Sequence, residues 1–186
     1  DSIVRFSQKV GAKVYGETLC SRSVYPYSED NWIGSLTANE DPTEIDSDLN
    51  IHIGCVTNNS IVKDNKKTAP ETIIVSNDKN APNNQIRCDH SIIGHIGSIV
   101  SEISDHLDYY CDDHRFKHER DKRLQMFRSD NNVEGAVPKH RLAESINNTL
   151  SDDIIFDEGI TAGFILRNYI DIDSIDLYGL KGGGLG

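Results

Sequence analysis

Short runs of apolar, mostly β-branched residues alternate along this chain with stretches of helical periodicity. The apolar runs lie at 12–17, 49–55, 71–76, 89–93 and 154–157. Apolar side chains recur with the spacing of one helical face in residues 1–10, 97–107 and 138–149. Strands that alternate with helices form parallel sheets whose faces the helices cover. We therefore expect an α/β fold.

Composition limits the partners of the chain. Its 186 residues suffice for one domain or for parts of two, and 37% hydrophobic with 26% charged residues is typical of a soluble globular protein. The net charge of −11 argues against nucleic acid and anionic membranes as partners, because both attract clustered Lys and Arg. No apolar run approaches the roughly 18–20 residues of a membrane span, and no signal peptide opens the chain, so we expect a cytoplasmic protein.

The cysteines favour a reducing compartment and no zinc site. They are widely separated and never form a CxxC pair, which structural zinc sites require. Reduced thiols in a cytosolic protein are the favoured interpretation. The four residues are Cys20, Cys55, Cys88 and Cys111.

The chain divides into three parts by composition. Residues 1–110 are predicted to form a partial central α/β domain, and 133–186 the start of a second one. Between them, 111–132 is very highly charged and is predicted to form a linker helix over the surface. His114 and His118 have a spacing that could hold a metal, but a solvated helix face is favoured in so charged a segment.

Two segments of the second part suggest a phosphate and cofactor site. The strand 154–157 ends in a turn containing Gly159 and is followed by a helix, whose N-terminal N–H groups and dipole attract phosphate. Thr161 adds a hydroxyl donor there. Four of the five residues 182–186 are glycine, and a backbone without Cβ atoms lets a cofactor ring approach closely. On these general grounds phosphate binding stays open, because most such junctions bind nothing.

The order of these segments resembles a known family. Pro138, Leu142, Leu150, the run 157–161 and the glycines of 182–186 follow one another as in the opening of the diphosphate-binding domain of thiamine-diphosphate-dependent enzymes. The branch of benzoylformate decarboxylase and acetolactate synthase is the most similar. Residues 11–35 also resemble the latter part of that family's central domain, although Lys13 replaces its usual proline. The resemblance implies a partial Rossmann-like central domain followed by the first β-α elements of the diphosphate-binding domain.

The resemblance also implies cofactor-binding residues. Ile160 and Thr161 would lie at the diphosphate, and Glu158 and Gly159 would shape that turn. Gly183 would accept a hydrogen bond from the aminopyrimidine, with Leu185 as the apolar wedge beneath the thiazolium ring. The full predicted set is Glu158, Gly159, Ile160, Thr161, Gly183, Gly184 and Leu185.

By this resemblance the chain is a fragment of a thiamine-diphosphate- and Mg²⁺-dependent 2-oxo acid decarboxylase or of an acetolactate synthase-type carboligase. The family's metal motif and its catalytic glutamate have no match here, so we expect no catalytic and no metal-binding residue and no activity from the fragment alone. The whole protein is expected to be a homodimer or homotetramer, and FAD binding stays undetermined. The alternative is a non-catalytic nucleotide-binding or regulatory α/β module.

Overall fold

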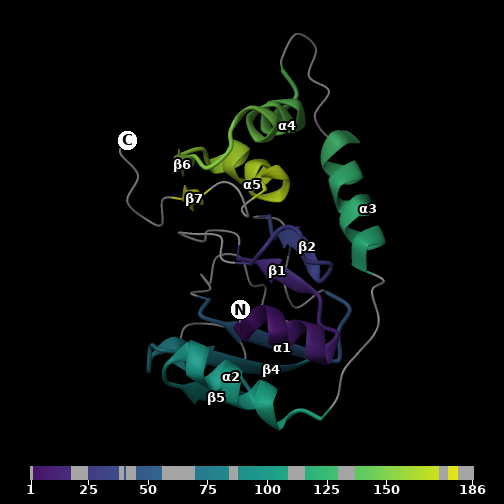
Figure 1. Ribbon diagram of the computed structural model, residues 1–186. Coiled ribbons are helices and arrows are strands. Elements are labelled where there is room, and N and C mark those ends of the chain that lie inside the picture. The colour runs from purple at the N-terminus through teal and green to yellow at the C-terminus, as the bar shows by residue number, and fades with distance from the viewer. Residues whose placement is uncertain are drawn as a thin grey trace. The chain divides into compact units, whose positions relative to one another are not determined.

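The chain is an α/β protein whose strands pair in parallel. The computed structural model describes residues 2–17, 25–37, 40, 45–55, 70–83, 88–108, 116–129, 137–171 and 176–179. Figure 1 shows the elements in chain order. They are α1 (Ser2–Val10), β1 (Val14–Gly16), β2 (Trp32–Ser35), β3 (Leu49–Ile53), β4 (Glu71–Ser76), the 3-10 turn η2 (Ala81–Asn83), β5 (His90–Ile93), α2 (Ile96–His106), α3 (Phe116–Ser129), α4 (Lys139–Thr149), β6 (Ile154–Asp157), α5 (Ile160–Tyr169) and β7 (Asp176–Gly179).

The described strands form three separate parallel sheets. β1 pairs with β2, β4 lies between β3 and β5, and β6 pairs with β7. The predicted α/β class with parallel sheets and flanking helices is therefore confirmed.

The chain also divides into two compact units. The first contains residues 1–6 and 37–108, and the second contains residues 7–36 and 109–186. The segment 7–36 thus packs with the C-terminal part of the chain. Compactness does not test the family domains inferred from the sequence, and the boundaries at 110 and 133 stay a prediction.

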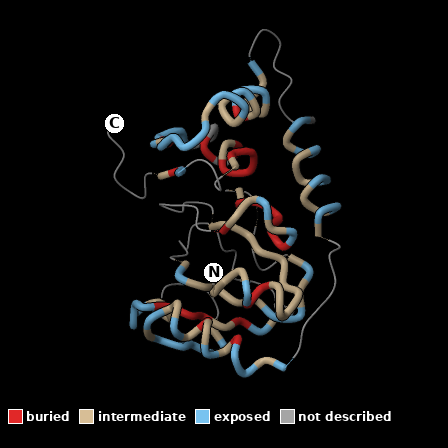
Figure 2. The backbone as a smooth tube through the Cα atoms, in the orientation of Figure 1, coloured by how far each residue is buried: buried red, intermediate tan, exposed pale blue. Residues whose placement is uncertain are grey.

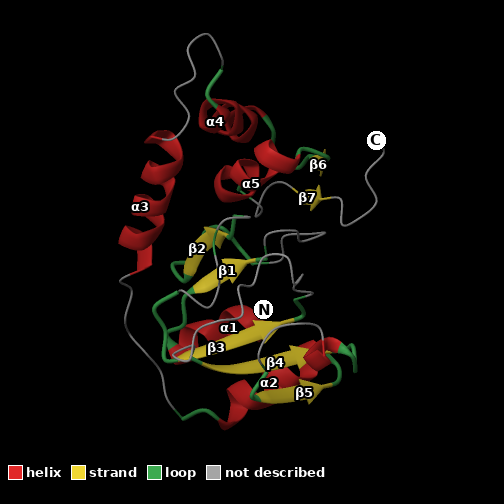
Figure 3. Cartoon of the chain, turned by 180° about the vertical axis from the view of Figure 1, so that it is seen from behind, coloured by secondary structure: helices red, strands yellow, loops and turns green. Residues whose placement is uncertain are grey.

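The first unit is built on the sheet β3–β4–β5, whose three strands point the same way in Figure 3. β4 is the central strand, and its Ile74 and Val75 are buried. α2 packs against β4 and buries Val100. β5 is an edge strand whose four residues are exposed. The predicted stripe of the helix 97–107 is consistent with this packing, because Val100 is one of its members.

In the second unit, α4 and α5 cover one face of the β6–β7 pair. Ile170 and Leu177 are almost completely buried, and Ile146 of α4 and Ile155 of β6 pack against them. A second cluster joins Ala143, Ile165 and Tyr169. Figure 2 shows the end of α5 as a buried segment. α5 is therefore held by its C-terminal half, while its first turn follows the end of β6.

A helix, α3, lies at Phe116–Ser129 within the predicted linker 111–132, and its role as a linker stays a prediction. Arg120 donates a hydrogen bond to the Tyr27 carbonyl at 2.8 Å and lies over the Tyr27 ring. Arg123 donates to the Ser35 carbonyl. α3 thus has a solvated side and a side that packs within the second unit, in contact with β2.

Several local expectations were wrong. β2 and β7 were not predicted from the sequence. Leu142 was expected in the buried stripe of its helix, but it is exposed and Ala143 takes the buried position. Phe156 of the apolar strand 154–157 is 76% exposed, because the helices cover only the other face of β6.

Candidate functional site

The junction between β6 and α5 presents a helix N-terminus without a side-chain cap. β6 ends at Asp157, Glu158 and Gly159 form the turn, and α5 begins at Ile160. Gly159 is the N-cap, with φ −79° and ψ 112°, and it makes no side-chain capping hydrogen bond. The first N–H groups of a helix have no partner inside the helix and form the positive end of its dipole. Both Glu158 and Gly159 are exposed.

Asp157 holds this turn in place from beneath. Its side chain is only 4% exposed. One carboxylate oxygen accepts a hydrogen bond from the Gly159 N–H at 2.8 Å, and the other pairs with Arg167 Nη2 at 3.3 Å. A Cβ at Gly163 would collide with the same carboxylate. The first turn of α5 therefore packs directly on a buried ion pair.

The second strand of the pair, β7, ends at the same sheet edge as this turn. β7 is parallel to β6, and Gly179 is the register partner of Asp157. In a parallel pair the carboxyl ends of both strands lie at one edge, which is where ligands bind in open α/β sheets. The start of α5 and the residue that leads into the glycine-rich run thus share an edge.

Four of the seven predicted cofactor-binding residues lie in the described part of the chain. Glu158 and Gly159 lie in the turn, and Ile160 and Thr161 belong to the first turn of α5. Gly183, Gly184 and Leu185 lie outside the described residues. The cofactor roles assigned to all seven stay predictions.

A second strand–glycine–helix junction occurs in the first unit, between β5 and α2. Gly94 follows β5, and His95 is the N-cap of α2. The His95 ring accepts a hydrogen bond from the Ser98 N–H at 3.2 Å. This helix end uses one of its own side chains to satisfy a terminal donor.

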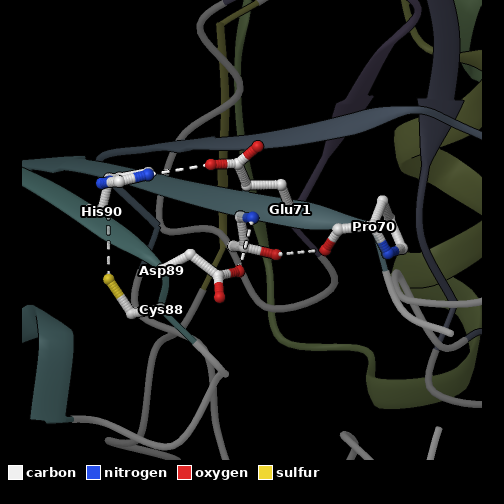
Figure 4. A network of polar contacts seen from close by, with 6 residues as sticks. Pro70, Glu71, Cys88, Asp89 and His90 are labelled. Atoms are coloured by element: carbon white, nitrogen blue, oxygen red, sulfur yellow. Dashed lines mark hydrogen bonds and ion pairs between the residues drawn. The ribbon is translucent and has the colours of Figure 1, made fainter. Parts of the chain in front are cut away.

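A polar network in the first unit lies at the opposite edge of its sheet (Figure 4). His90 Nε2 lies 2.8 Å from Glu71, and the Asp89 carboxylate accepts from the Thr72 N–H at 3.0 Å. The Cys88 thiol donates to the His90 carbonyl. Glu71 and His90 begin their strands, so the network is at the amino edge, away from the edge where α/β sheets bind ligands. We assign it a structural role.

Other site classes find no support in the described part of the chain. Within it, no three His, Cys, Asp or Glu side chains gather into a potential metal site. None of the described helices combines the length and apolar character that crossing a membrane requires. Cys88 is a free thiol.

Comparison with known proteins finds solved structures that share the fold of this chain. No protein-family model and no curated protein matches the sequence. Among solved structures, the chain superimposes along its whole length on benzoylformate decarboxylase from Polynucleobacter necessarius, with a TM-score of 0.69 and 15% identity. The chain has the fold of a segment of thiamine-diphosphate-dependent enzymes.

Two further structures share this fold at 15% identity. One is the thiamine diphosphate-dependent 4-hydroxybenzoylformate decarboxylase of Rhodococcus jostii RHA1, with a TM-score of 0.66 over 96% of this chain. The other is a protein from Mycobacterium smegmatis assigned as a thiamin diphosphate-dependent enzyme, with a TM-score of 0.65 over the whole chain. The chain spans about a third of each solved enzyme: 36%, 34% and 35% of their lengths. The fold resemblance that the sequence suggested is confirmed.

The sequence reasoning missed the partner of Asp157. Arg167 is the one charged residue in the otherwise apolar or neutral stretch 162–170. A lone charge in such a stretch is buried only with a partner of opposite sign. That signal, with an aspartate at the end of the preceding apolar strand, could have predicted the pair.

Proposed function

We propose that this chain is part of a thiamine-diphosphate-dependent enzyme acting on 2-oxo acids, and that the start of α5 binds the cofactor's diphosphate. The observation that supports this most is the register pairing of Asp157 with Gly179, which brings the uncapped helix start and the approach to the glycine-rich run to one sheet edge. The shared fold supports it independently.

The residues at this edge fit an anionic group. Backbone N–H donors at a helix start are well suited to phosphate oxygens. Gly159 is exposed and has no side chain to fill the approach. The nearby carboxylate of Asp157 would repel an anion, but its charge is paired with Arg167. The charge of Asp157 therefore does not exclude a diphosphate from this site.

Each predicted residue has one task in this proposal. The backbone N–H groups of Ile160 and Thr161 bind the diphosphate, together with the Thr161 hydroxyl, while Glu158 and Gly159 shape the turn. Gly183 and Gly184 face the pyrimidine, and Leu185 holds the cofactor bent. When bound, thiamine diphosphate supplies the electron sink for decarboxylation of a 2-oxo acid. The chain's own residues bind and orient it, and we propose no magnesium ligand or catalytic residue among them.

Within this class a decarboxylase is favoured over an acetolactate synthase-type carboligase. Two solved structures that share the fold are a benzoylformate decarboxylase and a 4-hydroxybenzoylformate decarboxylase. We therefore propose an aromatic 2-oxo acid as substrate and a homodimer or homotetramer as the active assembly, with Mg²⁺ as the accompanying ion.

Calorimetric titration of thiamine diphosphate into the full-length protein, with and without Mg²⁺, tests the proposal. We expect saturable binding that Mg²⁺ strengthens, together with release of carbon dioxide from benzoylformate. Absence of thiamine diphosphate binding would reject the proposal. Binding of a nucleotide in its place would support the non-catalytic module instead.

A further inference from the structure

The buried pair Asp157–Arg167 lies directly beneath the proposed diphosphate site, and the resemblance assigns it no role. Asp157 is 8% exposed and Arg167 is 6% exposed. An ion pair removed from water is costly to maintain, and replacing such a pair with apolar residues often stabilises a protein. Stability alone therefore does not explain why an ion pair is buried beneath this helix start.

Asp157 has a geometric task that an apolar residue could not perform. Gly159 provides no capping side chain, and Asp157 instead accepts the Gly159 N–H at 2.8 Å from two residues before it. This bond fixes the turn that leads into α5. The close contact with Gly163 fixes the first turn of the helix against the same carboxylate.

The same carboxylate creates an electrostatic problem. A negative charge at a helix N-terminus stabilises the helix, but it also competes with any anion that the terminus binds. Arg167, about two turns along α5, places its guanidinium 3.3 Å from the second carboxylate oxygen. Its positive charge cancels the field of Asp157 toward the helix start without removing the hydrogen bond to Gly159.

We propose that Asp157 and Arg167 are the positioning pair of the diphosphate site. Asp157 shapes the turn, and Arg167 keeps that carboxylate from repelling the bound anion. This inference rests on the proposed function, because it concerns the same helix start. It adds two residues that act through the turn and not by touching the cofactor.

The pair predicts different effects on cofactor binding when its two members are replaced. Arg167→Met leaves the Asp157 charge uncompensated, and we expect about tenfold weaker binding of thiamine diphosphate and of inorganic pyrophosphate. Asp157→Asn keeps an oxygen acceptor for Gly159 and removes the negative charge beneath the turn, so binding should be equal to that of the unmodified protein or tighter. The double variant should bind within about threefold of the unmodified protein.

A surface pair provides the matched control. Arg128 of α3 lies 2.8 Å from Glu144 of α4, and both are substantially exposed. Arg128→Met removes the same charge from the same unit, but solvent screens exposed charges, so binding should not change.

The experiment is calorimetric titration of the full-length protein and these four variants with thiamine diphosphate plus Mg²⁺ and with pyrophosphate, with thermal melting to show that each variant is folded. If Arg167→Met does not fold, Asp157→Asn and the double variant still test the inference. Weaker binding in both Asp157→Asn and the double variant would overturn the inference, because a pair that only stabilises the fold would lower the affinity in each of these variants. If the unmodified protein binds neither ligand, the proposed function itself fails.

Discussion

Two junctions of the same type, one in each unit, differ in how they satisfy a helix N-terminus. Between β5 and α2, the ring of His95 accepts the Ser98 N–H and caps the helix. Between β6 and α5, Gly159 has no side chain for this task, and a buried aspartate fixes the turn from beneath. A strand–glycine–helix motif is therefore not in itself a ligand site. What distinguishes the second junction is that its N-cap residue, Gly159, makes no side-chain capping hydrogen bond.

The largest expected difference between the two junctions concerns the glycines in the first turns of their helices, Gly163 in α5 and Gly97 in α2. A Cβ at Gly163 would collide with the Asp157 carboxylate, whereas a Cβ at Gly97 would lie 3.3 Å from the exposed His95 ring, which can move. Gly163→Ala should lower the free energy of unfolding by about 1–3 kcal/mol and weaken thiamine diphosphate binding. Gly97→Ala should change stability by less than about 1 kcal/mol. Chemical denaturation measures both, and equal effects would contradict the comparison.

A charge placed at the α5 N-cap tests the open terminus directly. Gly159→Asp should weaken thiamine diphosphate binding about tenfold or more, because its carboxylate would both cap the donors and repel the diphosphate. Gly159→Asn adds similar bulk without the charge and should weaken binding less. Both are measured by calorimetric titration.

Pro138 is the matched control for this charge. It is the N-cap of α4 and, like Gly159, makes no side-chain capping bond. Pro138→Asp should leave the cofactor affinity unchanged. A similar loss of affinity in Pro138→Asp and Gly159→Asp would show that net charge, and not the α5 terminus, governs binding.

Removal of the existing cap should have a smaller effect, confined to stability. His95→Ala should destabilise the first unit by about 0.5–1 kcal/mol, because a terminal donor of α2 loses its acceptor. His95→Ser restores an acceptor and should recover most of that loss. Thermal melting tests both variants, and a change in cofactor affinity would contradict the assignment of this junction as structural.

The smallest expected effect is a pH dependence in the first unit. Burial lowers the pKa of His52 in β3 below its usual value of 6.5. Its neutral form is favoured in the folded state, so this contribution to stability is present above about pH 6.5 and is lost as the pH falls through the lowered pKa. Denaturation at pH 7.5 and 5 should show this loss. His52→Phe should reduce this loss of stability. An unchanged pH dependence in the variant would show that His52 is not its source.

The sequence predicted the elements better than their pairing. β4 and α2 were found because their periodicity is regular, and the start of α5 because Gly159 interrupts an apolar run. β2 was missed since it has four residues and contains Gly34, whose φ of 137° is unusual for a strand. β7 begins with an aspartate and has no β-branched residue.

For the same reason, only part of the candidate site could be predicted from the sequence. The turn 158–161 follows from local sequence, but the pairing of Asp157 with Gly179 is a long-range property that no local pattern contains. The ion pair to Arg167 depends on the helix packing back on its own strand. The residue types predicted a phosphate-binding turn, but the ion pair beneath this turn is evident only from the three-dimensional fold.

Backbone amide chemical shifts provide the most direct test that the α5 terminus, and not the α2 terminus, binds the cofactor. Thiamine diphosphate with Mg²⁺ would be titrated into isotope-labelled full-length protein. The account predicts large shifts of the Gly159, Ile160 and Thr161 amides and none at Gly97 or Ser98. Shifts at α2, or saturating binding that leaves the α5 amides unchanged, would contradict it.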